Sequence, residues 1–145
     1  MTFEIVNPEA LGQPRGWNNG MLARAGGRVL FVAGQTARDP GAGSFPSGFV
    51  EQFEGALANL LLVVRAAGGG PEHVGRLTIY VTDIRSYRSN LKPLGEAYRR
   101  HMGRNYPAMA LVAVTALVDP EAQVEIEATA VVPAASGAVP NSENP

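Results

Sequence analysis

Apolar and polar side chains alternate through the stretch Gln123-Val124-Glu125-Ile126-Glu127-Ala128-Thr129-Ala130-Val131. Successive side chains of a strand point to opposite faces of its sheet, so this period of two predicts a half-buried strand. One face would carry Val124, Ile126, Ala128 and Ala130, and the other Glu125, Glu127 and Thr129. The two glutamate Cα atoms would then lie about 7 Å apart on one face.

The glutamate pair is the first candidate for chemistry. Two carboxylates on an apolar sheet can serve as a general acid and a general base. A solvated strand face is the alternative interpretation, and the spacing of Glu125 and Glu127 alone favours it. A catalytic role for the pair therefore needs support from elsewhere in the chain.

The rest of the chain alternates between predicted strands and helices. Strands are expected at 3–6, 20–25, 28–34, 77–82, 109–116 and 123–132, and helices at 48–67 and 89–102. The dipeptide Gly26-Gly27 predicts a two-residue hairpin between the strands at 20–25 and 28–34. Ser47 is the expected N-cap of the first helix, and Gly68-Gly69-Gly70-Pro71 its end. The order β-β-α-β-α-β-β, preceded by the short strand at 3–6, predicts an α+β domain.

Two of the predicted strands are apolar on both faces, which bears on assembly. In the strand at 28–34, Val29, Phe31 and Ala33 point one way, and Leu30 and Val32 point the other. The strand at 109–116 has the same pattern. Two helices can cover only one face of such a sheet, so we expect another copy of the chain to cover the second face. The alternative is that the terminal segments fold over that face.

The composition limits the possible functions. The chain has 145 residues, 46% of them hydrophobic, which suits a single domain, expected at 1–132. A formal net charge of −1 is not typical of bulk nucleic-acid binding proteins. No cysteine is present, which excludes disulfides, thiolate nucleophiles and cysteine-ligated metals. His73 and His101 are the two histidines and are interpreted as structural, so we expect no metal and no cofactor.

The two ends of the chain and its apolar runs bear on location. Residues 133–145 contain few large apolar side chains and are expected to form a flexible tail. The start of the chain lacks the basic and apolar segments of a secretory signal. The longest apolar run, at 108–118, is too short for a bilayer, which takes about 20 residues. We therefore expect a soluble, cytoplasmic protein that does not bind a membrane.

One stretch of the chain is basic. It contains Arg85, Arg88, Lys92, Arg99, Arg100 and Arg104. The helix expected at 89–102 would place its basic side chains opposite an apolar stripe formed by Leu91, Leu94, Tyr98 and Met102. A solvated helix face is the favoured interpretation, and an anion or RNA site is the alternative. No aromatic platform for stacking bases accompanies the stretch.

Four segments have an order and spacing that are specific in combination. They are Val32-Ala33-Gly34-Gln35, the helix from Gln52 through Asn59 to Gly68, Tyr80-Val81-Thr82-Asp83, and Tyr106-Pro107-Ala108 leading to Val124-Glu125-Ile126-Glu127-Ala128. Together they resemble the RidA/YjgF family of small enamine/imine deaminases, historically also labelled L-PSP endoribonucleases, over about residues 15–132. The resemblance implies a chorismate-mutase-like α+β fold with two helices on one face of a mixed sheet. It also implies a homotrimer with a small-molecule pocket at each subunit interface.

The resemblance further implies a set of site residues. In the family, a glutamate of the closing strand positions or activates the attacking water, and Glu125 occupies this position. The substrate-binding positions fall on Trp17, Ala33, Gly34, Gln35, Lys92, Met109, Ala110 and Leu111. The chain departs from the family here, because Met109 replaces the arginine that holds the substrate carboxylate and Ala110 replaces the neighbouring serine.

The replacement at Met109 changes what the pocket can bind. A guanidinium forms a bidentate contact with a carboxylate, and a thioether cannot. Arg15, Arg104 or Lys92 would have to supply the missing charge from another direction. Without such compensation, the pocket residues would suit an aromatic or uncharged ligand, or would only pack a subunit interface.

Three functional hypotheses follow from the sequence. The first is a RidA-type hydrolase or deaminase that acts on an imine, an enamine or a related small molecule, with Glu125 orienting water. The second is a non-catalytic trimer that binds a metabolite at its interfaces. The third is an RNA-directed activity, which the net charge of −1 disfavours.

Overall fold

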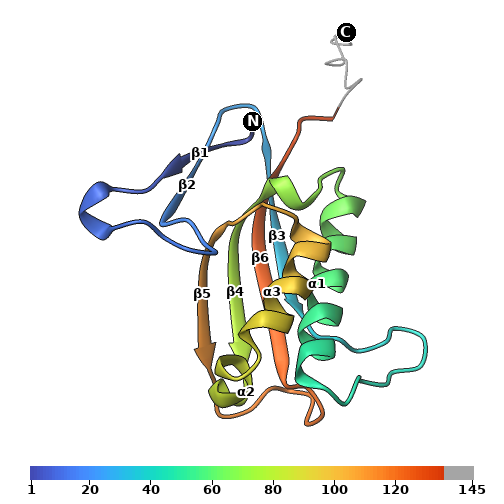
Figure 1. Ribbon diagram of the computed structural model, residues 1–145. Helices are drawn as coiled ribbons and strands as arrows, with labels where there is room; N and C mark the ends of the chain where they lie inside the picture. Colours follow the sequence, from blue (N-terminus) through green and yellow to red (C-terminus); the bar gives the residue numbers. More distant parts are fainter. Residues whose placement is uncertain (136–145) are drawn as a thin grey trace, which may run out of the picture.

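The alternating stretch forms a central strand of the sheet. In the computed structural model, which describes residues 1–135, it is β6 (Val124–Val132). β6 pairs antiparallel with β3 (Arg28–Gln35) on one side and with β4 (Val74–Val81) on the other. β5 (Ala108–Ala113) pairs in parallel with β4 and completes the order β3-β6-β4-β5. The sheet is therefore mixed, as predicted (Figure 1).

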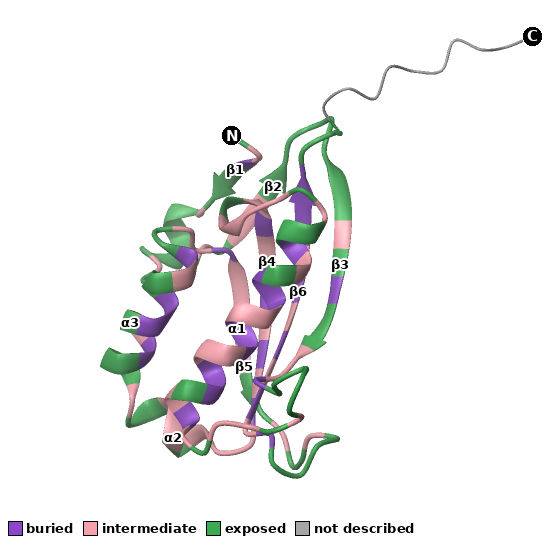
Figure 2. Ribbon diagram, turned by 90° about the vertical axis from the view of Figure 1, so that its right-hand side faces the viewer, coloured by how far each residue is buried: buried purple, intermediate pink, exposed green. Residues whose placement is uncertain are grey.

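Two helices cover one face of this sheet. α1 (Phe49–Ala66) and α3 (Leu91–Met102) lie side by side over it, and no helix of residues 1–135 covers the opposite face (Figures 1 and 2). The core between the layers contains Leu57, Leu60 and Val64 of α1, which are fully buried. Burying a leucine stabilises the fold by about 2 kcal/mol, so the helix layer is fixed by its apolar stripe. The prediction of an α+β fold with its helices on one face is confirmed.

The helix-free face is apolar along both edges of the sheet. Phe31 and Val29 of β3 are 81% and 60% exposed, and Val112 of β5 is 43% exposed. Val32, which points to the other side of β3, is only 4% exposed and lies in the core. The pattern of strands that are apolar on both faces is thus confirmed. The second copy of the chain expected on the exposed face stays a prediction.

A buried glutamine fixes the start of β6. Gln52 of α1 is 1% exposed. Its Nε2 donates to the carbonyl oxygens of Pro46 and Glu121 at 2.8 and 2.9 Å, and its Oε1 accepts from the backbone N–H of Gln123 at 2.7 Å. Because the polar atoms of the buried amide are all bonded, the side chain avoids the cost of an unsatisfied group. It ties α1 to the strand that carries Glu125.

Helix α1 starts slightly later than predicted and ends where predicted. Its N-cap is Gly48, whose carbonyl oxygen accepts from the N–H of Gln52 at 2.9 Å. Ser47 is not the cap, because its carbonyl oxygen accepts instead from Nε2 of Gln123 at 3.0 Å. At the other end, Gly68 adopts φ +87°, and the N–H groups of Gly68 and Gly69 close a Schellman motif on the last turn.

The predicted hairpin between 20–25 and 28–34 is wrong. β2 (Gly20–Ala23) pairs antiparallel with β1 (Phe3–Val6) in a separate two-stranded sheet, so the predicted short strand at 3–6 is present. Gly26 does turn the chain, at φ +95°. Gly27, however, lies so close to Val131 of β6 that a Cβ atom would clash with its side chain. The chain after Gly27 therefore runs along β6. β3 pairs with β6 instead of with the strand at 20–25 (Figure 1).

The helix predicted at 89–102 is present as α3 (Leu91–Met102), and a short helix that the sequence did not predict precedes it. α2 (Ile84–Arg88) precedes α3, because Asp83 caps it by accepting from the N–H of Arg85 at 2.9 Å. Leu91 was expected in the buried stripe, but it is 57% exposed because it lies in the first turn of α3, at the end of the core. Leu94, Tyr98 and Met102 of the stripe are buried as expected.

The remaining elements are short. Single 3-10 turns span Glu9–Leu11 and Pro71–His73, and β5 ends before residue 116, the predicted limit. The flexible tail predicted at 133–145 lies, from residue 136 onward, outside the described residues. Within the described part of the chain, no helix combines the length and apolar character needed to cross a membrane.

An ion-pair cluster fastens α1 to α3. Glu54 accepts from Nε and Nη2 of Arg100 at 2.9 and 2.8 Å, and its Oε1 lies 3.1 Å from Nε2 of His101. The hydrogen bond from Arg100, reinforced by His101, lowers the pKa of Glu54 to about 2 although burial opposes this shift. His101 therefore has a structural partner, as interpreted. His73 has one as well, because its Nδ1 accepts from the N–H of Gly70 at 2.8 Å.

The Glu54→Gln variant tests this cluster. The native pKa of about 2 lies below the ordinary value of 4.5, so Glu54 stabilises the fold above about pH 4.5 and loses this effect as the pH falls toward 2. At pH 7 the variant should lose at most about 1 kcal/mol of unfolding free energy, because the ion pair is partly solvated. Urea unfolding at pH 7 and at pH 2.5 is the measurement. A deficit that persists undiminished at pH 2.5 would contradict the assignment, and Glu9→Gln, which removes an exposed carboxylate elsewhere, is the control.

Candidate functional site

The strand register divides the predicted site residues between the two faces of the sheet. Glu125 lies opposite Tyr80 of β4, and Glu127 lies opposite Thr78, all on the helix-free face. The intervening Ile126 is fully buried on the helix side. On β5, Met109 and Leu111 pack against the helix-side core, whereas Ala110 between them is exposed on the helix-free face. A period of two therefore separates Glu125 and Ala110 from Met109 and Leu111.

On the helix-free face, a tyrosine distinguishes the two glutamates. The Tyr80 hydroxyl donates to Oε1 of Glu127 at 2.7 Å. This hydrogen bond, together with the nearby carboxylates, raises the pKa of Tyr80, so the phenol stays protonated and keeps donating. Glu127 is thereby held, and Glu125 is the glutamate of the pair that Tyr80 does not hold. It is half-buried and accessible to a small molecule.

Gly34 leaves the space that the Glu125 carboxylate occupies. β3 is irregular between Val32 and Gln35, and Gly34 lies there directly beneath Oε1 of Glu125. A Cβ atom at position 34 would overlap the carboxylate where it now lies, so a larger residue there would make the Glu125 side chain shift. Ala33 and Gln35 flank the glycine, and Nε2 of Gln35 donates to the carbonyl oxygen of Ala33 at 3.1 Å. The structure thus places Gly34 against Glu125, with Ala33 and Gln35 on either side of the glycine in β3, and a substrate-binding role for these three residues stays a prediction.

The helix-covered face contains a cavity of about 490 Å³. It lies between α3, β5 and the loop that precedes β2. Its aromatic and apolar walls include Trp17, Tyr87, Tyr98, Tyr106, Met109 and Leu111. The rings of Tyr98 and Tyr106 stack with their centroids 5.5 Å apart, which makes one wall rigid. This size and lining are typical of small-molecule pockets.

A hydrogen-bonded loop holds Trp17 at the cavity. The side chain of the adjacent Asn18 accepts from Nδ2 of Asn7 at 2.8 Å and donates to the carbonyl oxygen of Tyr106 at 2.6 Å. The Asn18 N–H also donates to the carbonyl oxygen of Pro107 at 3.2 Å. The loop is therefore attached to the chain just before β5, and Trp17 and Met109 both line the cavity.

Of the remaining predicted residues, one lines this cavity and the others do not. Arg15 contributes to its wall, and the side chain of Arg15 is exposed. Lys92 is exposed and is not among the lining residues, although its neighbour Leu91 is. Arg104 is also exposed and does not line the cavity. Of the three compensating cations considered from the sequence, only Arg15 is at the cavity.

Among the wall residues that sequence reasoning did not assign to a site are Arg99 and Gly95. Arg99 was grouped with the solvated face of the helix, and it is indeed exposed, but it also lines the cavity. The signal for it was present, because residues 91, 95 and 99 are spaced by four and share one helix face. A glycine in the middle of this face leaves room beside the arginine.

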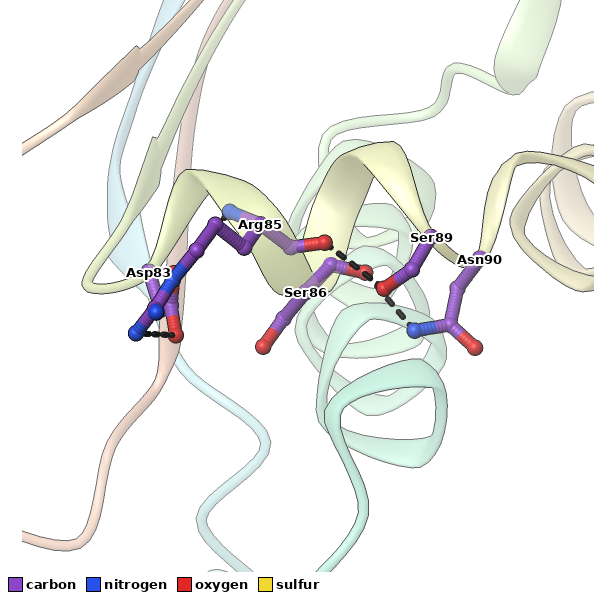
Figure 3. Close-up of polar contacts among 5 residues, drawn as sticks. All are labelled: Asp83, Arg85, Ser86, Ser89 and Asn90. Carbon is purple, nitrogen blue, oxygen red and sulfur yellow. Dashed lines mark hydrogen bonds and ion pairs between the residues drawn. The ribbon is translucent and has the colours of Figure 1, made fainter.

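The other arginines of the basic stretch are partly used within the fold. Nε and Nη2 of Arg85 donate to the Asp83 carboxylate at 3.1 and 3.2 Å, and Asn90 closes the same segment by donating to the carbonyl oxygen of Ser86 (Figure 3). Arg100 is bound to Glu54. The stretch is therefore not a continuous unpaired basic surface.

Comparisons with known proteins match this fold and these segments. The family model described as Endoribonuclease L-PSP matches residues 10–132. A human protein named 2-iminobutanoate/2-iminopropanoate deaminase is 32% identical over 105 residues, which cover 72% of this chain and 73% of the relative. The crystal structure of YyfB from Yersinia pestis, a Rid-family protein of unknown function, has a TM-score of 0.79 and 32% identity over 91% of this chain and 100% of its own. E. coli TdcF with bound serine has a TM-score of 0.64 and 26% identity over 88% and 98% of the two chains.

The Asn18→Ala variant tests how Trp17 is held. The substitution removes the two side-chain hydrogen bonds of the loop, so the unfolding free energy should fall by about 1–2 kcal/mol. Trp17 is the only tryptophan, and its emission maximum should move to longer wavelength as the loop loosens. Asn19→Ala, at the exposed neighbouring position, is the matched control and should leave the spectrum unchanged. An unchanged Asn18→Ala spectrum would show that these bonds do not position Trp17.

Proposed function

Because the chain belongs to the RidA/YjgF family, matched through the Endoribonuclease L-PSP model, we propose that it hydrolyses a small imine or enamine to a carbonyl compound and ammonia. The observation that carries this proposal is the Glu125 carboxylate lying on the helix-free face over Gly34, beside the Tyr80–Glu127 pair. Relatives named 2-iminobutanoate/2-iminopropanoate deaminase support the reaction class.

Glu125 acts on the attacking water in this proposal. The carboxylate accepts a proton from water as the water oxygen adds to the imine carbon and the nitrogen is protonated, which gives a carbinolamine. A second proton then reaches the nitrogen as the carbon–nitrogen bond breaks, and the hydroxyl group loses its proton to become the carbonyl. One water is consumed, and one ammonia leaves with the former imine nitrogen. An enamine enters the same route after a proton is added to its carbon. The bond between Tyr80 and Glu127 leaves Glu125 free for this role.

The site of this reaction would be completed by a second copy of the chain. Within one protomer the cavity opens on the helix side at β5, whereas Glu125 lies two strands away on the opposite face. Two strand spacings amount to about 10 Å, and the sheet itself lies between them. A ligand in the cavity would therefore meet a glutamate only from a neighbouring subunit. The exposed Phe31, Val29 and Val112 provide an apolar surface for such a contact, in the homotrimer that the family resemblance implies.

A non-catalytic metabolite-binding trimer is the second candidate function. It is favoured by Met109 and Leu111, which make the cavity apolar where the family resemblance implies an arginine. An imine carboxylate bound near Met109 would lack a bidentate partner at that position. The pairing of Arg85 with Asp83 and of Arg100 with Glu54 gives no support to an RNA-directed function.

The Glu125→Gln variant separates the two candidates. The assay follows ammonia and keto acid released from freshly generated 2-aminoacrylate. The wild-type protein should accelerate release, and the variant should lose at least about 100-fold of this acceleration, because the water is no longer activated. Glu121→Gln, at an exposed carboxylate in the turn before β6, should match the wild type. Full activity of Glu125→Gln would remove this residue from the mechanism, and no acceleration by the assembled wild type would favour the binding protein.

The Phe31→Glu variant tests the assembly. A charge at this 81% exposed position should prevent a second copy from covering the helix-free face. Native mass spectrometry should then find the wild type at three times 15.3 kDa and the variant as a single chain. Leu62→Glu, which alters a 61% exposed apolar side chain on α1, should assemble normally. A monomeric wild type, or an unaltered Phe31→Glu assembly, would contradict the proposed interface.

A further inference from the structure

The cavity combines an apolar interior with two cationic side chains and no acidic one. Arg15 and Arg99 both contribute to its wall, from the loop before β2 and from α3. Both side chains are exposed, so their charges lie toward solvent at the mouth rather than in the interior. No aspartate or glutamate is among the described residues that line the cavity. Two positive charges without a local counter-charge favour an anion at this mouth.

The position of Arg99 depends on Gly95. The guanidinium nitrogen Nη1 of Arg99 lies 3.4 Å from the place where a Cβ atom of residue 95 would be. The side chain thus folds back by one helical turn over the glycine, along the cavity wall. Arg100, the next residue, is instead bound to Glu54 on the other side of the helix. Among the described residues, ion pairs engage Arg85 and Arg100, whereas Arg15 and Arg99 take part in none.

The interior of the cavity suits a ring or another bulky apolar group. Trp17, Tyr98 and Tyr106 supply flat aromatic walls, and Met109 and Leu111 supply adaptable aliphatic ones. A dry cavity of about 150 Å³ is enough for a benzene ring, so about 490 Å³ holds a ring together with a short chain. A guanidinium at position 109 would take up part of this volume and would place charge beside the ring.

We propose that the cavity binds a carboxylate with a bulky, ring-sized apolar body, held at the mouth by Arg15 and Arg99 and with its body beside Trp17 and Met109. The family resemblance implies an arginine at position 109, in the interior of the cavity. With Met109 there, the positive charges lie at the mouth instead. The apolar body of the ligand, rather than its carboxylate, then enters the interior. The inference deepens the proposed function, on which it rests for the reaction, by naming the substrate class. That class is the imines of amino acids with large apolar side chains, which the cavity should hold more tightly than the imine of alanine.

Fluorescence of Trp17, the only tryptophan, reports binding directly. The probes are 3-phenylpropanoate, its uncharged amide 3-phenylpropanamide, and propanoate, which keeps the charge and lacks the ring. The full-length assembled protein should bind 3-phenylpropanoate at least about tenfold more tightly than either of the others, because only this probe satisfies both parts of the cavity. Added salt should weaken binding of the acid and leave binding of the amide unchanged.

Charge variants locate the anion. Arg15→Gln and Arg99→Gln should each weaken 3-phenylpropanoate binding by about tenfold and leave 3-phenylpropanamide binding as it was. Arg104→Gln, at an exposed arginine outside the cavity, is the matched control and should bind like the wild type. Equal affinity for the acid and the amide, equal affinity for propanoate, or wild-type binding by both Arg15→Gln and Arg99→Gln would overturn the proposal.

The binding readout keeps this inference apart from the proposed hydrolysis. Glu125→Gln should still bind 3-phenylpropanoate more tightly than 3-phenylpropanamide, because Arg15 and Arg99 of the cavity wall, and not Glu125, hold the carboxylate. If the probe pattern holds while no imine is hydrolysed, the hydrolase proposal fails and the carboxylate site stands. If imines are hydrolysed but the acid binds no better than its amide, the hydrolase proposal stands and the carboxylate site fails.

Discussion

The hydrogen bonding of β6 on both of its edges is the constraint on which the rest of the structure depends. β3 and β4 hold this strand in antiparallel register, so its alternating side chains have no freedom to exchange faces. Val124 and Ile126 are fully buried beneath the helices, and Glu125 and Glu127 consequently lie on the opposite face. A slip by one residue would bury two carboxylates in the core, so the observed register is much more stable than the slipped one. The fixed position of Glu125 is a by-product of this packing.

The same sheet divides the chemistry of the protein between two surfaces. Glu125, Gly34 and Tyr80 form a polar group on the helix-free face, whereas Trp17, Met109 and Leu111 line a cavity on the other face. Neither group alone holds both an attacking water and an apolar ligand. Association of identical subunits is a simple way to bring them together, because it also covers the exposed apolar side chains of β3 and β5. In the proposed homotrimer, assembly and function would be linked through this one surface.

Several residues of the segments that resemble the family are structural rather than chemical. Gln52 ties α1 to the start of β6, and Nδ2 of Asn59 donates to the carbonyl oxygen of Thr36 at 2.9 Å, beyond the end of β3. Both amides fix the ends of strands that carry site residues. These two residues of the resembling segments therefore support the sheet rather than take part in chemistry. Met109 lines the cavity, and in the proposed site this apolar side chain would favour a ring over a charge in the interior.

Local pattern determined the periodic features of this protein, and contacts between distant segments decided the rest. The alternation at 123–131, the Schellman end at Gly68 and the glutamate pair on one face all follow from neighbouring residues, because strand and helix geometry set side-chain direction. The pairing of β3 with β6 instead of β2, the partner of His101, and the place of Arg99 beside a cavity do not follow in this way. Each requires segments far apart in sequence to meet, and periodicity carries no information about which segments these are. The sequence thus determined where Glu125 points, and only the tertiary structure decided that the cavity lies on the other side of the sheet.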